Sequence, residues 1–146
     1  MPAGPSLVDM LANAAFYYGT ATMLGDNCAA EAPPCDFQTA KANFYAAAKA
    51  GLHSTIVWKD KPVSVRTLIL DTLLPMAKEG LERLGIDSAD VIYYLEIIGE
   101  RTRSGRNGAQ WQIDYAKKHG RDMQKLTEAY WRCQQTGEPV HTWEIP

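Results

Sequence analysis

Three arginines near residue 104 are the side chains of this sequence best suited to binding a ligand. Arg101, Arg103 and Arg106 alternate with small residues in the segment Arg101–Gly108, which the pattern predicts as a loop just before a helix. Guanidinium groups bind carboxylate and phosphate oxygens through paired hydrogen bonds, and a helix N-terminus favours the same anions. The segment therefore predicts an anion-binding loop, with a solvated basic loop as the alternative.

No other group of side chains has the spacing of a catalytic or metal site. His53, His119 and His141 are far apart in the sequence and have no cysteine or carboxylate at ligand spacing. Glu96 and Glu100 share one helix face, a pattern typical of a solvated surface. We therefore expect this chain to contain neither a catalytic residue nor a metal ligand.

The cysteines do not indicate a disulfide framework or a zinc site, because their number is odd and no CxxC pair occurs. Cys28 and Cys35 flank a proline-rich loop, and a bridge between them is the alternative to free thiols in a reducing compartment. No basic residue precedes the first apolar stretch, so no secretory signal is expected. These features predict a cytoplasmic protein.

Length and composition are those of one soluble globular domain. With 46% hydrophobic and 22% charged residues, the chain has an ordinary balance for such a protein. The net charge of -2 argues against a nucleic-acid partner, since nucleic-acid-binding domains usually carry a strongly basic face. No apolar run reaches the roughly 18 residues of a membrane span. We expect neither nucleic acid nor membrane among the partners, and a small nucleic-acid binder using the arginine loop is the least favoured alternative.

Capping residues and apolar periodicity predict an all-α fold, an irregular bundle of about six helices. The predicted helices span residues 6–25, 36–51, 64–85, 87–100, 107–119 and 122–136. Pro75 predicts a kink or a local break in the third of these helices, because proline removes a backbone hydrogen bond. The β-branched segment His53–Trp58 predicts one short strand or extended arm, followed by a turn at Lys59–Pro62.

Residues 1–137 are predicted to form a single helical domain, followed by an extended tail at 138–146. Val140, Trp143 and Ile145 are the apolar residues expected to hold the tail against the domain. Tryptophans are large anchors in a small core, so Trp111, Trp131 and Trp143 are expected to be buried.

Four segments of the chain occur in the order in which one known family carries similar ones. They are Pro2–Gly19, Asn43–Leu52, Leu73–Ala77 and Gly108–Gln112. The first resembles a stretch that opens the C-terminal helical half of the type-2 glutamate–cysteine ligase family of carboxylate–amine ligases. The second resembles that family's Asn-Arg-Trp-Arg-Ala-Ala-Arg-Tyr-Gly-Leu helix. The likeness covers essentially the whole chain, but only the last part of a full-length family member.

The resemblance implies an ATP-dependent ligase, in which a glutamate-like carboxylate is activated as an acyl phosphate and then attacked by an amine such as that of cysteine. It places the metal-binding carboxylates and much of the ATP site in an N-terminal sheet portion before Met1. This chain would then be the C-terminal helical part, inactive alone, with ATP and Mg²⁺ bound by the full-length enzyme. Asn43, Lys49 and the three loop arginines would face anionic ligands from one wall of the cleft.

The segment that begins at Asn43 departs from the family pattern. Phe44 and Ala46 stand where the family has arginines, and only Lys49 keeps a positive charge. A lysine is a point charge rather than a planar fork, so it would bind an anion in a different geometry. The departure favours a second hypothesis, a free-standing helical interaction module derived from that scaffold and without catalysis.

A helical half without its sheet would expose apolar surface, and large exposed apolar patches favour association. The sequence therefore predicts a homo-oligomer, with the contact near Leu7, Leu11 or Val57.

Overall fold

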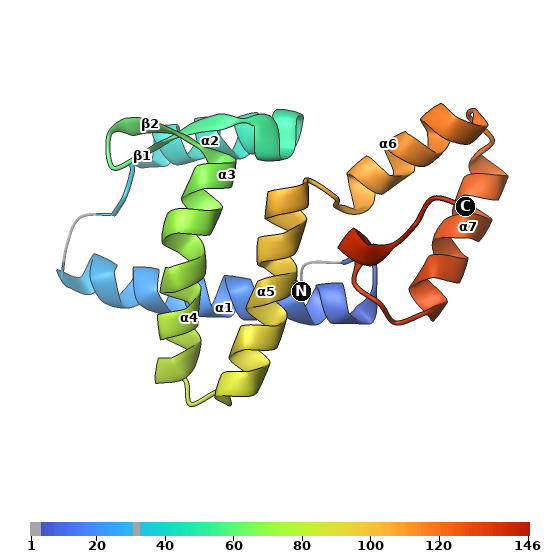
Figure 1. Ribbon diagram of the computed structural model, residues 1–146. Coiled ribbons are helices and arrows are strands. Elements are labelled where there is room, and N and C mark those ends of the chain that lie inside the picture. Colours follow the sequence, from blue (N-terminus) through green and yellow to red (C-terminus); the bar gives the residue numbers. More distant parts are fainter. Residues whose placement is uncertain (1–3, 31–32) are drawn as a thin grey trace.

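The fold is all-α, as predicted, and it contains one small hairpin. The computed structural model describes residues 4–30 and 33–146, and the side chains of residues 27–30 are outside this description. The elements are α1 (Leu7–Ala30), α2 (Phe37–Ala50), β1 (Thr55–Trp58), β2 (Lys61–Ser64), α3 (Val65–Leu68), α4 (Leu74–Arg83), α5 (Ser88–Ser104), α6 (Gly108–His119) and α7 (Met123–Gln135). A π-helical turn joins α3 to α4, so the described residues form six helical rods (Figure 1). None of these helices is both long enough and apolar enough to cross a membrane.

The first helix begins where the sequence predicts but ends later. The Ser6 hydroxyl donates to the Asp9 carboxylate at 2.8 Å, and the Asp9 backbone N–H donates to Ser6 Oγ at 3.3 Å. The sequence predicts an end near Gly25, yet α1 continues to Ala30. Gly25 does not adopt the positive φ by which a glycine ends a helix, so the helix passes through it.

The break predicted at Pro75 is a π-helical turn. Proline has no N–H to donate to the carbonyl of Asp71, which leaves a gap in the α-helical pattern. The backbone widens over Ile69–Leu73 just before the proline, and the Leu74 N–H donates to the Ile69 carbonyl, five residues earlier. The turn thus accommodates the proline without ending the helix.

The extended segment predicted at 53–58 forms a strand over Thr55–Trp58, which is one half of a hairpin, whereas His53 ends a 3-10 turn. β1 pairs antiparallel with β2, and Val57 lies opposite Pro62. Lys59 and Asp60 form the two-residue turn, both with positive φ, at 48° and 62°. Such a turn matches the right-handed twist of the paired strands. The predicted turn through Pro62 is wrong, because Lys61 and Pro62 belong to β2.

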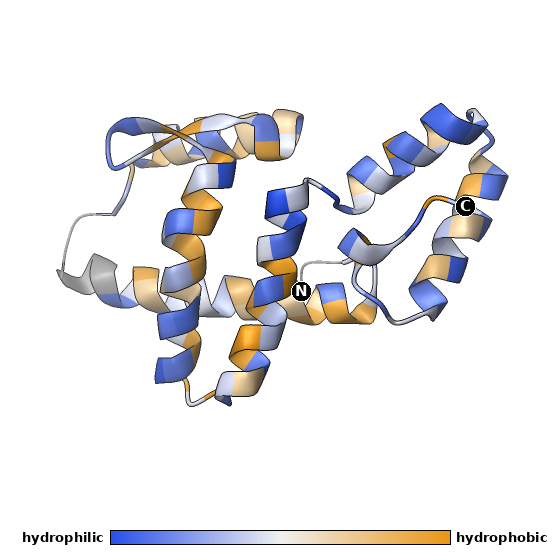
Figure 2. Cartoon of the chain, viewed as in Figure 1, coloured by the Kyte–Doolittle hydropathy of each residue, from blue (hydrophilic) through white to orange (hydrophobic). Residues whose placement is uncertain are grey.

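The main core lies where α1 crosses α4 and α5 (Figure 1). Figure 2 shows apolar and polar positions alternating along α4 and α5, as expected for helices with one buried side. The buried apolar residues of this core are Ala12, Ala77, Leu81, Val91, Leu95, Ile97 and Ile98.

A second, aromatic cluster joins α6, α7 and the tail, and its buried members are Trp111, Tyr115, Val140 and Trp143. The tail packs onto the body as predicted, with Ile145 against the same cluster. It is not extended throughout, because residues Val140–Thr142 form a 3-10 turn. The prediction that Trp131 is buried in the core is wrong, since this side chain on α7 is 58% exposed.

The end of α5 also differs from the prediction. The sequence predicts a loop over Arg101–Gly108, but α5 runs to Ser104 and ends at Gly105, which has a left-handed φ of 73°. Alternating arginine and small residues do not themselves interrupt a helix, whereas the glycine does. Arg101 and Arg103 therefore lie on the last turn of α5, where the helix dipole favours positive charge.

Candidate functional site

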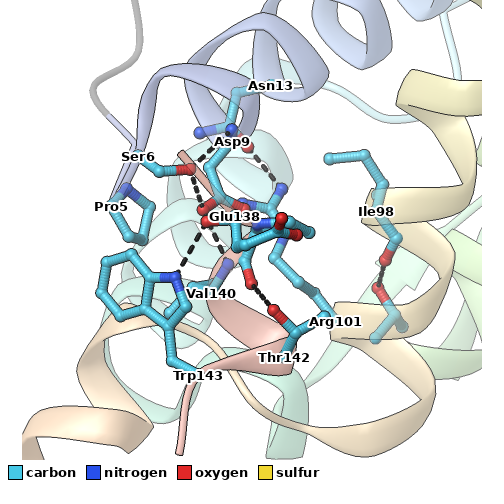
Figure 3. A network of polar contacts seen from close by, with 12 residues as sticks. Pro5, Ser6, Asp9, Asn13, Ile98, Arg101, Glu138, Val140, Thr142 and Trp143 are labelled. Carbon is cyan, nitrogen blue, oxygen red and sulfur yellow. Dashed lines mark hydrogen bonds and ion pairs between the residues drawn. The ribbon is translucent and has the colours of Figure 1, made fainter. Parts of the chain in front are cut away.

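The Asp9 carboxylate, on the first turn of α1, is fully buried. Its Oδ2 accepts hydrogen bonds from the Ser6 hydroxyl at 2.8 Å and from the Val140 backbone N–H at 2.9 Å. Its Oδ1 faces the Arg101 guanidinium at 3.2 Å. Figure 3 shows these contacts, in which the start of α1, the end of α5 and the tail converge on one carboxylate. Because an unpaired buried carboxylate is strongly unfavourable, these donors fix the three segments relative to one another.

Arg101 is a largely buried cation held from two sides. Its Nη1 donates to Asp9, and its Nη2 donates to Oδ1 of Asn13 at 2.5 Å. Its side chain is 13% exposed. Burial lowers the pKa of Arg101, and the adjacent Asp9 carboxylate opposes that shift by favouring the charged form. Arginine does not lose its proton in proteins, so the guanidinium is a fixed positive group.

A cavity of about 240 Å³ lies beside this guanidinium. Its polar lining is supplied by Asn13, Arg101, Thr102 and Asn107, and its apolar lining by Phe16, Leu52, Ile69 and Ile98. A guanidinium, two side-chain amides and one hydroxyl beside apolar side chains are groups that can orient a small carboxylate-bearing or phosphate-bearing ligand. We take this cavity, the Arg101 cavity, as the candidate functional site.

Of the five residues that the sequence predicts for the ligand site, Arg101 alone lines this cavity in the part of the chain that the structure describes. Arg103 instead donates to Glu96 at 2.5 Å and to Glu100 at 2.8 Å. Arg106 donates to the backbone carbonyl of Trp143. The three arginines therefore have separate partners, and the structure does not assemble them into one anion-binding loop.

Asn43 contacts the hairpin rather than the Arg101 cavity. Its Nδ2 donates to the Val57 carbonyl at 2.7 Å, and its Oδ1 accepts from the Val57 N–H at 2.8 Å. The amide thus occupies the outer edge of β1 as a neighbouring strand would. Lys49 is exposed on the last turn of α2, and it does not line the cavity either.

The sequence does not single out Asp9 as a site residue. One signal was present, because Asp9 and Asn13 are four residues apart and so share a face of α1. Two polar side chains on the face that meets the core need buried partners. The partner itself, Arg101, is 92 residues from Asp9, and no local pattern points to it.

Metal-ligating side chains do not gather in the described part of the chain: it contains no group of three histidine, cysteine or acidic residues placed to hold an ion. Cys133 is a free thiol, and burial raises its pKa. The side chain of Cys28 lies outside the described residues, and so does the possible bridge from Cys28 to Cys35.

No family model matches the chain, and neither a curated protein nor a solved structure matches it significantly. The class that the fold defines is an all-α protein with a two-stranded hairpin. The likeness to glutamate–cysteine ligases stays a prediction, which rests on segments such as Pro2–Gly19 and Asn43–Leu52.

Proposed function

We propose that this chain is the C-terminal helical part of an ATP-dependent carboxylate–amine ligase-like enzyme of the glutamate–cysteine ligase type. In this role it forms one wall of the substrate and nucleotide cleft and has no activity in isolation. The observation that carries the proposal is the Arg101 cavity, where Asp9 and Asn13 hold a guanidinium beside an apolar hollow. The order of the ligase-like segments along the chain supports the same reading.

The reaction implied by the resemblance needs groups that hold anions still. A substrate carboxylate oxygen attacks the γ-phosphorus of ATP, ADP leaves, and an acyl phosphate forms. The amine nitrogen then attacks the acyl carbon, phosphate leaves, and the nitrogen loses a proton. Arg101 would bind and orient a carboxylate or phosphate oxygen, and the amides of Asn13 and Asn107 would supply further hydrogen bonds. No step through Mg²⁺ is assigned to the described residues, since they contain no cluster suited to it.

A reconstitution experiment tests the proposal. Amide formation and ADP release are measured with ATP, Mg²⁺, glutamate and cysteine, first for this chain and then after adding the sheet portion that a reading frame before Met1 would encode. We expect product only from the combination. Ligation by this chain alone would contradict the proposal, and so would a combination that forms no product.

Two matched variants test the role of the cavity in that combination. Arg101→Lys keeps the charge but removes the planar fork, so we expect a raised KM for the acid substrate. Arg103→Lys, on the same turn of α5 but paired with surface glutamates, should leave KM unchanged. Urea unfolding of both variants checks that the fold is intact. If neither Arg101→Lys nor Lys49→Ala changes the KM of the combined protein for the acid substrate, this chain does not contribute to the substrate site.

One observation favours the second hypothesis, a helical interaction module without catalysis. α2 buries none of its residues, and Phe37, Phe44 and Tyr45 are 78%, 69% and 62% exposed. Exposed aromatic side chains on one helix are typical of a surface that meets a partner. The DNA before Met1 separates the two hypotheses, because an uninterrupted frame encoding a sheet-rich ligase half supports the ligase, whereas a stop codon and ribosome-binding site support the module.

A further inference from the structure

The chain has a net charge of only -2, but it contains two segments whose net charges have opposite signs. Residues 36–64, which form α2 and the hairpin, contain four basic and two acidic side chains, a net charge of +2. Residues 65–104, which include α3, α4 and α5, contain five basic and seven acidic side chains, a net charge of -2. Surfaces of opposite sign on two molecules attract within a Debye length, about 10 Å at 0.1 M salt.

The basic segment presents aromatic side chains to solvent. Phe37 and Phe44 are seven residues apart on α2, so they lie on one face two turns apart, with Lys41 between them. The rings of Phe44 and Tyr45 meet edge to face at 5.8 Å, which holds both in a defined position. We call these four residues the basic aromatic face. Figure 1 shows α2 at one edge of the molecule, away from α6 and α7.

The acidic segment carries an apolar groove. Two hollows, of about 570 and 330 Å³, share Ile92 and Glu96 in their lining. Ile92 and Tyr93 are 62% and 52% exposed, and Glu100 also lines the larger hollow. The α5 groove, defined by these four residues, combines an exposed apolar surface with two glutamates that both pair with Arg103, so these three charged side chains leave one net negative charge beside it.

We propose that the basic aromatic face of one copy of this chain binds the α5 groove of a second copy. An amphipathic helix that places residues i, i+4 and i+7 in an apolar groove is a common mode of recognition. Charge complementarity favours this pairing over contact between two α2 helices, which would bring like charges together. The contact joins two different surfaces, so two copies can bind each other reciprocally or continue into a longer chain. The inference does not depend on the ligase proposal.

Sedimentation velocity at increasing protein concentration tests the association. We expect a shift from monomer to dimer or larger species, and a weaker association when NaCl rises from about 0.01 M to about 1 M, which shortens the Debye length from roughly 30 to 3 Å. A monomer at every concentration would overturn the proposal. Association that is insensitive to salt would overturn the argument from charge.

Variants of exposed residues identify the two surfaces without disturbing the core. Phe44→Ser on α2 and Ile92→Ser on α5 should each weaken association by about tenfold or more, as loss of an interface anchor does. Ile113→Ser on α6 is the matched control, because Ile113 is also exposed, at 49%, and lies on neither surface. A control variant that weakens association as much as the other two would contradict the assignment.

Mixing the two weakened variants tests whether the contact is between unlike surfaces. The Phe44→Ser copy keeps an intact α5 groove, and the Ile92→Ser copy keeps an intact basic aromatic face. Their mixture should therefore recover one productive contact and form a heterodimer, whereas each variant alone remains weak. No recovery in the mixture would overturn the pairing of these two surfaces.

Two further probes cover other anionic partners of the basic aromatic face. Flotation with phosphatidylserine-containing vesicles and fluorescence anisotropy with a single-stranded RNA oligonucleotide are measured on the same wild-type and Phe44→Ser proteins. We expect no binding that depends on Phe44. Phe44-dependent binding to either probe by a protein that stays monomeric would assign the face to that partner and overturn self-association.

Discussion

The backbones of Gly19 in α1 and Gly80 in α4 touch where the two helices cross. A Cβ on Gly80 would lie far inside van der Waals contact with the Gly19 carbonyl, and a Cβ on Gly19 would collide with the carbonyl of Ala77. Both glycines are buried, so an added side chain could not turn toward solvent. The closeness of this crossing is what brings the apolar sides of α1 and α4 together in the main core.

Gly80→Ala should therefore destabilise the protein, although alanine is the better helix former. We expect the free energy of unfolding to fall by about 1–3 kcal/mol, the usual cost of overpacking, measured by urea denaturation followed by circular dichroism. Gly25→Ala is the matched control, since Gly25 is also helical but has nothing within 4 Å of its Cβ position. Its stability should be unchanged or raised by up to about 1 kcal/mol. Equal losses in the two variants would contradict the contact at the crossing.

The starts of the helices could be predicted because side chains mark them. Asp36, Asn107 and Asp122 each accept a hydrogen bond from a backbone N–H three residues later, at 2.7, 2.9 and 3.2 Å. The ends of α1 and α5 are less predictable from the sequence. Gly25 stays helical within α1, and helices tolerate the alternating arginine and small residues at the end of α5.

The hairpin and the Arg101 cavity depend on contacts that no local pattern contains. Pro62 reads as a turn residue, but Val57 opposite it bonds to Asn43 on α2, so β1 does not need the N–H that proline lacks. Likewise, Val140 is 131 residues from Asp9, to which it donates. Long-range pairs of this kind are set by how the helices pack, and a single sequence does not reveal that packing.

Asp9→Asn tests whether the buried ion pair holds the three segments together. The asparagine is nearly the same size, but it leaves the guanidinium of Arg101 without its carboxylate partner. We expect the free energy of unfolding to fall by about 3–5 kcal/mol, the cost of breaking a buried pair. Asp114→Asn breaks a surface pair with Lys117, and should cost less than about 1 kcal/mol. Losses of similar size in the two variants would show that Asp9 has no special role.

Trp143 and Trp131 are predicted to differ sharply when each is replaced by alanine. Trp143 is 4% exposed, packs edge to face on Trp111 and Tyr130, and donates from Nε1 to the Glu138 carbonyl at 2.8 Å. Trp143→Ala should lower the free energy of unfolding by about 3–5 kcal/mol, with the earliest loss of hydrogen-exchange protection in α6 and α7. Trp131→Ala, which removes a largely exposed ring, should stay within about 0.5 kcal/mol. The opposite order would refute the docking of the tail.

His141, on the 3-10 turn of the tail, should make stability depend on pH. Burial lowers the pKa of His141 below its ordinary value of 6.5, helped by Arg101 and Arg106 and opposed by the carboxylates of Glu100 and Asp9. The folded protein therefore binds this proton less readily than the unfolded chain does. The free energy of unfolding should be unaffected by this group above about pH 6.5 and should fall as the pH drops from there through the lowered pKa.

Urea denaturation between pH 7.5 and pH 5 measures this dependence, and the useful comparison is between two histidine variants. His141→Gln should reduce the loss of stability on acidification, because glutamine takes up no proton. His53→Gln should keep the wild-type dependence, since His53 is exposed next to the hairpin and far in sequence from the tail. If the two variants lose stability equally as the pH falls, the half-buried His141 is not the source of the pH dependence.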